Sequence, residues 1–305
     1  DGTVGNTTPS PLTYDDFSFF FTDADLLALT NPGTAILDPK STLIASDDTL
    51  ENTVTTLYFD IIVGLESGWE VKNQLFYEEY QNLNENAYGF SQFHDTYVIE
   101  DKLVFSNTYT FDNLIASVQL SPSIRYTDFE HGDDYTNEYF ARRDLTGPST
   151  ALDRRLLATR IDDDYTEYYV GEYTNLGLAF LTDLSWENGI SLLIGARHDR
   201  IDMESSTPGD KLLYGGSDDS ASAEDDVSGN SWTVSLSYDI ANSGIIPYFT
   251  MSEQSTVIAG QGAELQVDNI AEGTAFDSSE LTEFGVKGEL LEDDRLYFSL
   301  SHYEQ

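Results

Sequence analysis

Five arginines in the polar segment 130–166 are the residues of this sequence best suited to recognition chemistry. The chain holds 14 basic against 55 acidic residues, so five arginines in one segment are unusual. A guanidinium binds a carboxylate or phosphate through two parallel hydrogen bonds, and nearby aromatic rings would flank an aromatic anion. We therefore predict a site for an anionic ligand in this segment, formed by Arg142, Arg143, Arg154, Arg155, Arg160, Tyr135, Tyr139 and Phe140.

The same arginines have a simpler interpretation. Aspartates crowd the segment, and ion pairs with them would hold a long loop folded without any ligand. Pairing within the segment is slightly favoured over ligand binding. The aspartates concerned are Asp133, Asp134, Asp153, Asp162, Asp163 and Asp164.

Other reactive residues are poorly placed for catalysis or metal binding. The four histidines are scattered and lack the spacing of a zinc site. His94-Asp95 and His198-Asp199 resemble the acid–base pairs of a hydrolase, but adjacent residues of a strand point to opposite faces. The sequence thus predicts no catalytic residue, no metal site and no cofactor.

Acidic clusters and a glycine pair give no stronger site. Asp218-Asp219, Glu224–Asp226 and Glu292–Asp294 lack the ligand spacing and glycine of a calcium loop, so solvated loop charge explains them better. Gly260-Gln261-Gly262 begins like a dinucleotide fingerprint, but Leu265 stands where the third glycine belongs. We interpret these glycines as loop residues.

Composition excludes several classes of protein. A net charge of −41 would repel nucleic acid over most of the surface, and the absence of cysteine removes disulfides and thiolate sites. No run of roughly 18 apolar residues exists, so a transmembrane helix is not expected. Membrane-spanning strands need only about 9 to 11 residues each and stay possible.

Alternation of apolar and polar residues recurs along the chain and predicts about ten strands. Between 231 and 240, for example, every second residue from Trp232 to Ile240 is apolar and the others are Ser, Thr or Asp. Asp101 breaks the pattern by sharing an apolar face with Ile99 and Leu103, unless a bulge shifts the register. The predicted strands are 57–65, 69–80, 96–109, 116–127, 167–184, 189–202, 231–240, 245–253, 280–290 and 295–305.

Basic residues of these strands fall on the polar face. This placement is expected if the apolar face meets lipid, where a Lys or Arg at mid-membrane costs roughly 2 to 4 kcal/mol. A soluble sandwich with one wet face is the alternative. The basic residues are Lys72, Lys102, Arg125, Arg197, Lys287 and Arg295.

Short and long connections alternate between the predicted strands, as they do in outer-membrane barrels with short periplasmic turns. Tight turns are expected at 67–68, 110–113, 185–188, 242–244 and 291–294, and long loops at 81–95, 130–166, 203–230 and 254–279. In this topology both chain ends lie outside the cell, so we expect an all-β, antiparallel transmembrane β-barrel of the outer-membrane type, here incomplete. Residues 1–53 would form an external loop region, with a short helix near 17–29, and residues 54–305 a partial β-barrel.

The stretches IIPYFTMSEQSTVIAG and AFDSSELTEFGVKGELLEDDRLYFSLSHYEQ resemble the barrel of TonB-dependent receptors of the ferric-siderophore type. The resemblance extends over most residues after about 54, but nothing resembles the plug domain, the TonB-contacting segment or the final barrel strands. Glu283, Gly285 and Lys287 would be strand and lumen residues. The resemblance implies a receptor of the bacterial outer membrane that takes up a ferric siderophore by ligand-gated transport and is not an enzyme.

The implied partners are a ferric siderophore or similar chelate, the TonB complex through the missing plug, and outer-membrane lipid and lipopolysaccharide, whose phosphates are another candidate for the arginines of 130–166. Three alternatives stay open: a passive porin-like channel with an inward loop, an outer-membrane hydrolase using the His-Asp pairs, and a soluble acidic adhesin.

Overall fold

The computed structural model describes residues 49–85, 91–134, 165–212, 215–241, 243–290 and 296–305. Ten strands dominate this part of the chain, and four short helices lie in the connections. The strands are β1 (Thr49–Gly64), β2 (Glu70–Glu85), β3 (Ser91–Thr110), β4 (Leu114–Asp134), β5 (Glu167–Trp186), β6 (Ile190–Thr207), β7 (Ala221–Tyr238), β8 (Ile245–Val257), β9 (Phe276–Leu290) and β10 (Leu296–Glu304). The helices are η2 (Gly209–Lys211), η3 (Ser217–Asp219), η4 (Gln261–Ala263) and α3 (Val267–Ala271).

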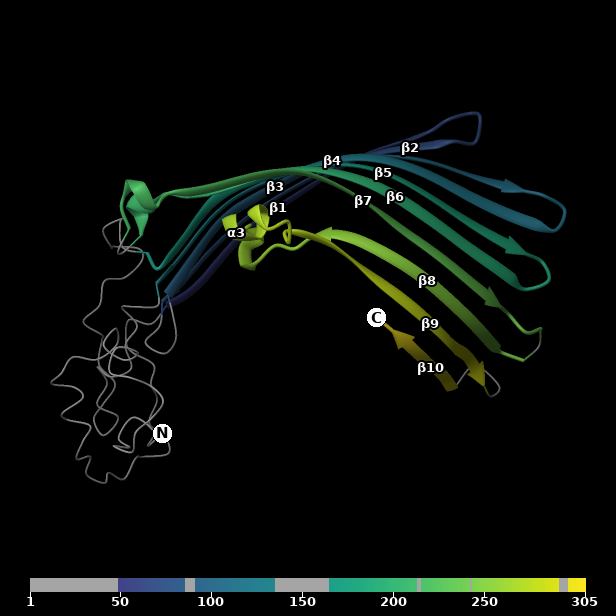
Figure 1. Cartoon of the computed structure of the whole chain (residues 1–305). Helices are drawn as coiled ribbons and strands as arrows, with labels where there is room; N and C mark the ends of the chain where they lie inside the picture. The colour runs from purple at the N-terminus through teal and green to yellow at the C-terminus, as the bar shows by residue number, and fades with distance from the viewer. Residues whose placement is uncertain (1–48, 86–90, 135–164, 213–214, 242, 291–295) are drawn as a thin grey trace, which may run out of the picture.

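All ten strands form one antiparallel sheet in the order of the sequence, from β1 to β10. The sheet bends into an arch, and α3 lies under its concave side near one end of the strands (Figure 1). Each strand pairs with the next, as in β5 and β6 from Val170↔Ser206 to Ser185↔Ser191, and the β3–β4 ladder keeps its register across a gap between Lys102↔Ser123 and Phe105↔Leu120. The predicted all-antiparallel barrel architecture with ten strands is therefore confirmed for the described residues.

Short turns join the strands at the end of the arch opposite α3, as predicted. Glycines with positive φ close three of them: Gly68 at +85°, Gly189 at +90° and Gly244 at +65°. Residues other than glycine rarely adopt this conformation, which explains the glycine at each of these three turns. In the first turn Leu65 N donates to Trp69 O at 2.7 Å.

The strands run further at the other end than the sequence predicts, so the expected loops are too long. β2 and β3 extend to 85 and from 91, which leaves only 86–90 of the predicted loop 81–95. β6 and β7 likewise shorten the predicted loop 203–230 to 208–220, and the loop 254–279 shrinks to 258–275. The alternation is lost there because both faces carry polar residues, while the backbone ladder continues.

The two faces of the sheet differ sharply in character. Ile201 and Met203 pack against Leu265 and Ile270 of the 258–275 connection, so they mark the inner, concave face. The alternate residues of each strand point outward, and many apolar side chains on that face are exposed, such as Leu178 on β5 at 52%. The apolar residues predicted to share a face between 231 and 238 are on this outer side: Trp232, Val234, Leu236 and Tyr238. Ile240 lies beyond β7 and forms an isolated bridge with Ile245.

The basic residues of the strands follow the prediction. By register, Lys72, Lys102, Arg125, Arg197 and Lys287 are on the inner face, and Lys72 Nζ binds Asp60 at 2.8 Å. Arg295 lies outside the described residues. The outer face therefore carries an apolar band that ends toward α3 at Tyr97, Tyr126 and Trp232, beyond which acidic residues such as Asp95, Asp128 and Asp226 follow.

Asp101 is on the outer face without any bulge. The β2–β3 register is uninterrupted, with Asp101 opposite Leu75, and on β4 it faces Ile124. The carboxylate accepts a hydrogen bond from Asn73 Nδ2. The bulge proposed from the sequence is therefore wrong, and a neighbouring amide supplies the polar contact instead.

The predicted division at residue 53 differs from the observed strand boundary. β1 begins at Thr49, so five residues of the proposed loop region 1–53 belong to the first strand. The helix expected near 17–29 lies outside the described residues. None of the helices in the described ranges is long and apolar enough to cross a membrane.

Candidate functional site

The eight residues predicted as ligand contacts lie outside the described residues, because all fall within 135–164. Their position and contacts stay a prediction. The site described below is therefore built from the inner face of the sheet and from residues 258–275, which we name the inward loop.

The inward loop is held against the inner face by a small apolar core. Leu265 and Ile270 are 1% and 3% exposed and pack against Phe129, Ile201 and Met203. Full burial of a leucine-sized side chain contributes roughly 1.5 to 3 kcal/mol. The inward loop, which contains η4 and α3, is thus a packed part of the structure. Figure 1 shows α3 on the concave side of the sheet.

Hydrogen bonds fix the backbone of the inward loop to two strands. Thr96 Oγ1 on β3 donates to the Gly262 carbonyl at 2.5 Å, and Ser205 Oγ on β6 donates to the Leu265 carbonyl at 2.5 Å. Gln92 Nε2 donates to Gln261 Oε1 at 3.0 Å. The loop therefore bridges β3 and β6 across the concave side.

Two histidines stack beneath η4, above the level of the apolar band. The rings of His94 and His131 lie 4.2 Å apart with an interplanar angle of 10°. His131 Nδ1 contacts the Phe93 carbonyl at 2.9 Å, and its Nε2 lies 3.4 Å from Asp133 Oδ2. The backbone of Gly262 packs closely against His94, since a Cβ at Gly262 would lie 2.4 Å from His94 Nδ1.

Burial and neighbouring charge separate the two histidines electrostatically. Burial and the adjacent His131 lower the pKa of His94 to about 4. Burial opposes the charged form of His131 too, but the hydrogen bond and charge of Asp133 outweigh it and raise that pKa. Burial also raises the pKa of Glu264 in the inward loop. The two stacked imidazoles thus have pKa values that are shifted in opposite directions.

The sequence contained a signal for this histidine pair that the prediction did not use. A hairpin turn near 110–113 sets the β3–β4 register, in which residues opposite each other have numbers that sum to 225. His94 and His131 satisfy that sum. The two histidines are far apart in the sequence, so they come together only through the pairing of β3 with β4 and not through a short motif.

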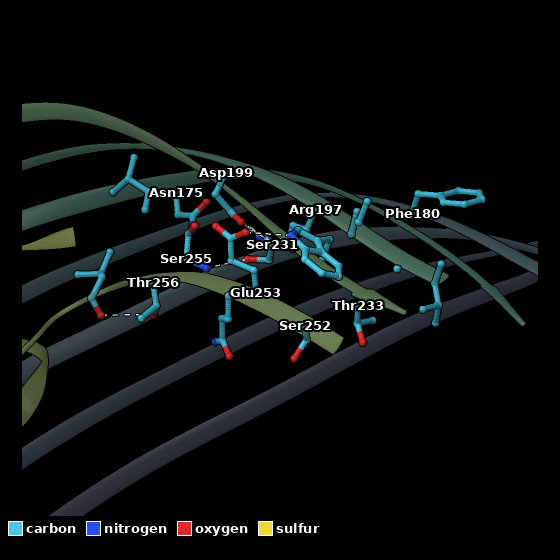
Figure 2. Close-up of a pocket in the computed structure, with 18 of the residues that line it drawn as sticks. Asn175, Phe180, Arg197, Asp199, Ser231, Thr233, Ser252, Glu253, Ser255 and Thr256 are labelled. Carbon is cyan, nitrogen blue, oxygen red and sulfur yellow. Dashed lines mark hydrogen bonds and ion pairs between the residues drawn. The ribbon is translucent and has the colours of Figure 1, made fainter. Parts of the chain in front are cut away.

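A second polar group lines the inner face nearer the short turns. Arg197 and Asp199 of β6 point to the same side, where Arg197 Nε and Nη2 each donate to the Asp199 carboxylate at 2.7 Å (Figure 2). They border an open cavity of about 820 Å³ that Arg125 and Asn175 also line, while Phe180 points away from it (Figure 2). This wall offers guanidinium groups to a ligand.

The candidate catalytic pairs do not converge. His94 is on the inner face and Asp95 on the outer face, where it accepts from Gln81 Nε2 at 3.4 Å. His198 contacts Asn230 Oδ1 at 3.0 Å on the outer face, whereas Asp199 binds Arg197 on the inner face. Each His-Asp pair is thus split between faces, as the alternation predicts.

The acidic clusters also behave as separate side chains. Asp226 pairs with Arg200, whose Nε donates to it at 3.1 Å. Within the described ranges, no three His, Asp or Glu side chains gather as metal ligands. Gly260-Gln261-Gly262 lies in the connection between β8 and β9, at the start of η4, where Gly262 has φ +63°. Glu292–Asp294 lie outside the described part.

The open, polar-lined arch matches solved structures of siderophore receptors. The siderophore receptor PiuA from Acinetobacter baumannii superposes with a TM-score of 0.64 at 13% identity, covering 88% of this chain and 42% of that chain. The ferric-catecholate import receptor Fiu from E. coli K12, in its open form, gives 0.62 at 12% identity, covering 94% and 45%. P. aeruginosa FpvA bound to pyoverdines gives 0.59 at 14%, covering 89% and 35%.

At these identities the structural similarity shows the fold alone, and the chain spans less than half the length of each receptor. Among curated protein sequences, none matches this chain. A family model described as "TonB dependent receptor-like, beta-barrel" matches residues 1–305. The chain therefore belongs to the TonB-dependent receptor β-barrel family.

Proposed function

We propose that the protein carrying this chain is a receptor of the bacterial outer membrane that imports a ferric siderophore by TonB-dependent transport. The observation that carries the proposal is the family match over residues 1–305. The solved structures of similar fold include receptors named for siderophore or ferric-catecholate import. No bond is made or broken in this function, which agrees with the split His-Asp pairs.

The division of the sheet into two faces supports a membrane position. The outer apolar band would contact lipid, and aromatic residues at its edge, Tyr97, Tyr126 and Trp232, suit the membrane interface. Beyond that edge, lipopolysaccharide would surround the rim. The inner face would enclose the transport path, since it carries the polar and basic strand residues.

The ligand contacts proposed for this function are the loop residues predicted from the sequence. Arg142, Arg143, Arg154, Arg155 and Arg160, with Tyr135, Tyr139 and Phe140, would bind an anionic ferric chelate at the external side. TonB would act through a plug domain in the complete protein. Both statements follow from residue chemistry and from the family.

A transport assay tests the proposal. Cells lacking their own siderophore receptors would express the intact protein, with and without TonB, and uptake of ⁵⁵Fe would be measured for catecholate, hydroxamate and carboxylate chelates. We expect TonB-dependent uptake of one chelate class, lowered at least tenfold by the double variant Arg142→Gln/Arg143→Gln. If cells with TonB took up none of the three chelate classes, the proposal would be contradicted.

A passive channel is the second candidate, because an inward loop that narrows the lumen is one of its expected features. The packing of Leu265 and Ile270 on the inner face provides such a loop. Liposome swelling with uncharged sugars distinguishes the two functions. A passive channel would let sugars through without TonB, whereas a plugged receptor would not.

A further inference from the structure

Arg197 presents a guanidinium that the surrounding strands hold in one position. Asp199, which is only 5% exposed, accepts two hydrogen bonds from it at 2.7 Å, and Ser123 Oγ on β4 accepts another from Nη2 at 3.3 Å. Nη1 donates to none of the described residues. One edge of the fork is thus fixed by the protein, and the other stays available to a ligand.

Gly177 on β5 makes room for this guanidinium. A Cβ at Gly177 would lie 2.0 Å from Arg197 Nη2 and 2.6 Å from Cζ. Real Cβ atoms do not approach so closely, so any other residue here would displace the arginine head. The guanidinium therefore lies directly against the wall of the sheet, at a place that the neighbouring strand leaves open.

Arg125 supplies a second guanidinium on the same wall. It is two residues from Ser123 on β4, hence on the same face, and it is exposed. Among the described residues it forms no ion pair. Glu100 stands opposite it in the β3–β4 register, but the ion pair of Glu100 is with Lys102, at 3.9 Å.

The cavity lining holds two guanidinium groups, Arg125 and Arg197, and two carboxylates, Asp199 and Glu253. Asp199 is bound to Arg197, and Glu253 accepts a hydrogen bond from Trp232 Nε1 at 2.9 Å. An anion entering the cavity meets two guanidinium groups, of which one is already oriented.

The cavity beside these arginines suits a small molecule. Its volume is about 820 Å³, within the range of roughly 300 to 1,000 Å³ of small-molecule sites. Val257, the last residue of β8, and Ala259, in the inward loop, line it as well, so the cavity lies next to the packed loop. Figure 2 shows Arg197 and Asp199 joined at this wall, near Asn175.

We propose that Arg125, together with the Arg197 that Asp199 orients, binds a carboxylate group of a small-molecule ligand on the inner wall of the barrel. This inference deepens the proposed function and rests on it for the role of the ligand as cargo. The two arginines of this site belong to β4 and β6, whereas the arginines predicted as ligand contacts belong to the segment 130–166 of the sequence.

Calorimetric titration of the intact protein in detergent with iron-free citrate tests the site at low salt. We expect citrate to bind and Arg125→Gln to weaken the affinity at least tenfold, because a hydrogen bond to a charged group is lost. Arg125→Lys keeps the charge without the planar fork and should lose less. Lys72→Gln, on the same face but outside the cavity, is the matched control and should bind like the parent.

The thermal unfolding temperature of each variant separates loss of binding from loss of folding. Absence of citrate binding to the intact protein, including the case in which another part of the protein fills the site, would overturn the proposal. Equal affinity in Arg125→Gln and Lys72→Gln would overturn it as well. Citrate binding requires neither iron nor TonB, so a failure of the transport assay would leave this result unaffected.

Discussion

The two ends of the arch hold their apolar side chains in opposite ways. Near α3, Leu265, Ile270 and Ile201 are 1–3% exposed in a small protein core on the inner face. Toward the short turns, Leu178 and Leu236 are 52% and 48% exposed on the outer face. The first end is stabilised by its own loop, and the second requires an apolar solvent around it.

We propose that this difference marks the position of the membrane. Beyond the apolar band the inward loop covers the inner face and the outer face is acidic, as expected of strands that project into water. Within the band, lipid would cover the outer face, which would then need no protein cover. The two parts of the sheet would therefore have different surroundings, lipid along the apolar band and water beyond it.

Truncating the buried leucine of the inward loop should have the largest effect on stability. Leu265→Ala removes a side chain that is 1% exposed, and we expect it to weaken loop docking by about 2 to 5 kcal/mol. Hydrogen exchange would show faster exchange in 258–275 with little change in β5. Unchanged protection of the loop would mean that the packing does not hold it.

A charge placed on either face should separate lipid from lumen. Leu178→Arg, on the outer face, should destabilise the protein by roughly 2 to 4 kcal/mol in phospholipid vesicles. Leu181→Arg, on the same strand but the inner face, should cost far less. Urea unfolding of both variants provides the comparison, and equal costs would contradict the assignment of the faces.

Two glycines of the inward loop test its contact with the histidine pair. Gly262 and Gly273 both have positive φ, at +63° and +71°, so alanine at either should cost about 1 to 2 kcal/mol of backbone strain. Only Gly262→Ala also drives a Cβ into His94, whereas nothing lies within 4 Å at Gly273. We expect greater loop exchange in Gly262→Ala, and equal exchange would disprove close packing on His94.

The smallest effect concerns the charged residue within the apolar band. The double variant Asn73→Leu/Asp101→Leu removes both polar partners from the outer face, and we expect no loss of stability and a gain of up to about 2 kcal/mol in bilayers. Asp101→Leu alone leaves Asn73 without this acceptor and should gain less. A large loss in the double variant would show that the pair serves the fold.

The sequence predicted the fold wherever the two faces of a strand differ in polarity. The segment 231–238 alternates cleanly and lies in β7 as predicted, whereas Glu224–Asp226 carry charge on both faces, so the sequence predicts a loop where β7 continues. Its ladder with β6 continues to Ala221 because backbone pairing does not depend on side-chain alternation.

The site was less accessible to sequence reasoning. Alternation alone places Arg197 and Asp199 on one face of β6, but the position of Gly177 beside the guanidinium depends on the β5–β6 register. Packing of Ile270 on Phe129 joins segments far apart in the chain, which no local pattern encodes. The eight loop residues of 135–164 stay untested.

The most direct test of the two-solvent account is a spin-label scan of β7 from 232 to 237 in the intact protein in bilayers. These 305 residues contain no cysteine, so each introduced cysteine carries the only label within them, and any cysteine elsewhere in the intact protein would first be replaced by serine. We predict that oxygen, which concentrates in lipid, reaches labels at 232, 234 and 236, and that a water-soluble nickel chelate reaches those at 233, 235 and 237. Equal access of the nickel chelate to both sets would contradict a membrane-facing outer surface.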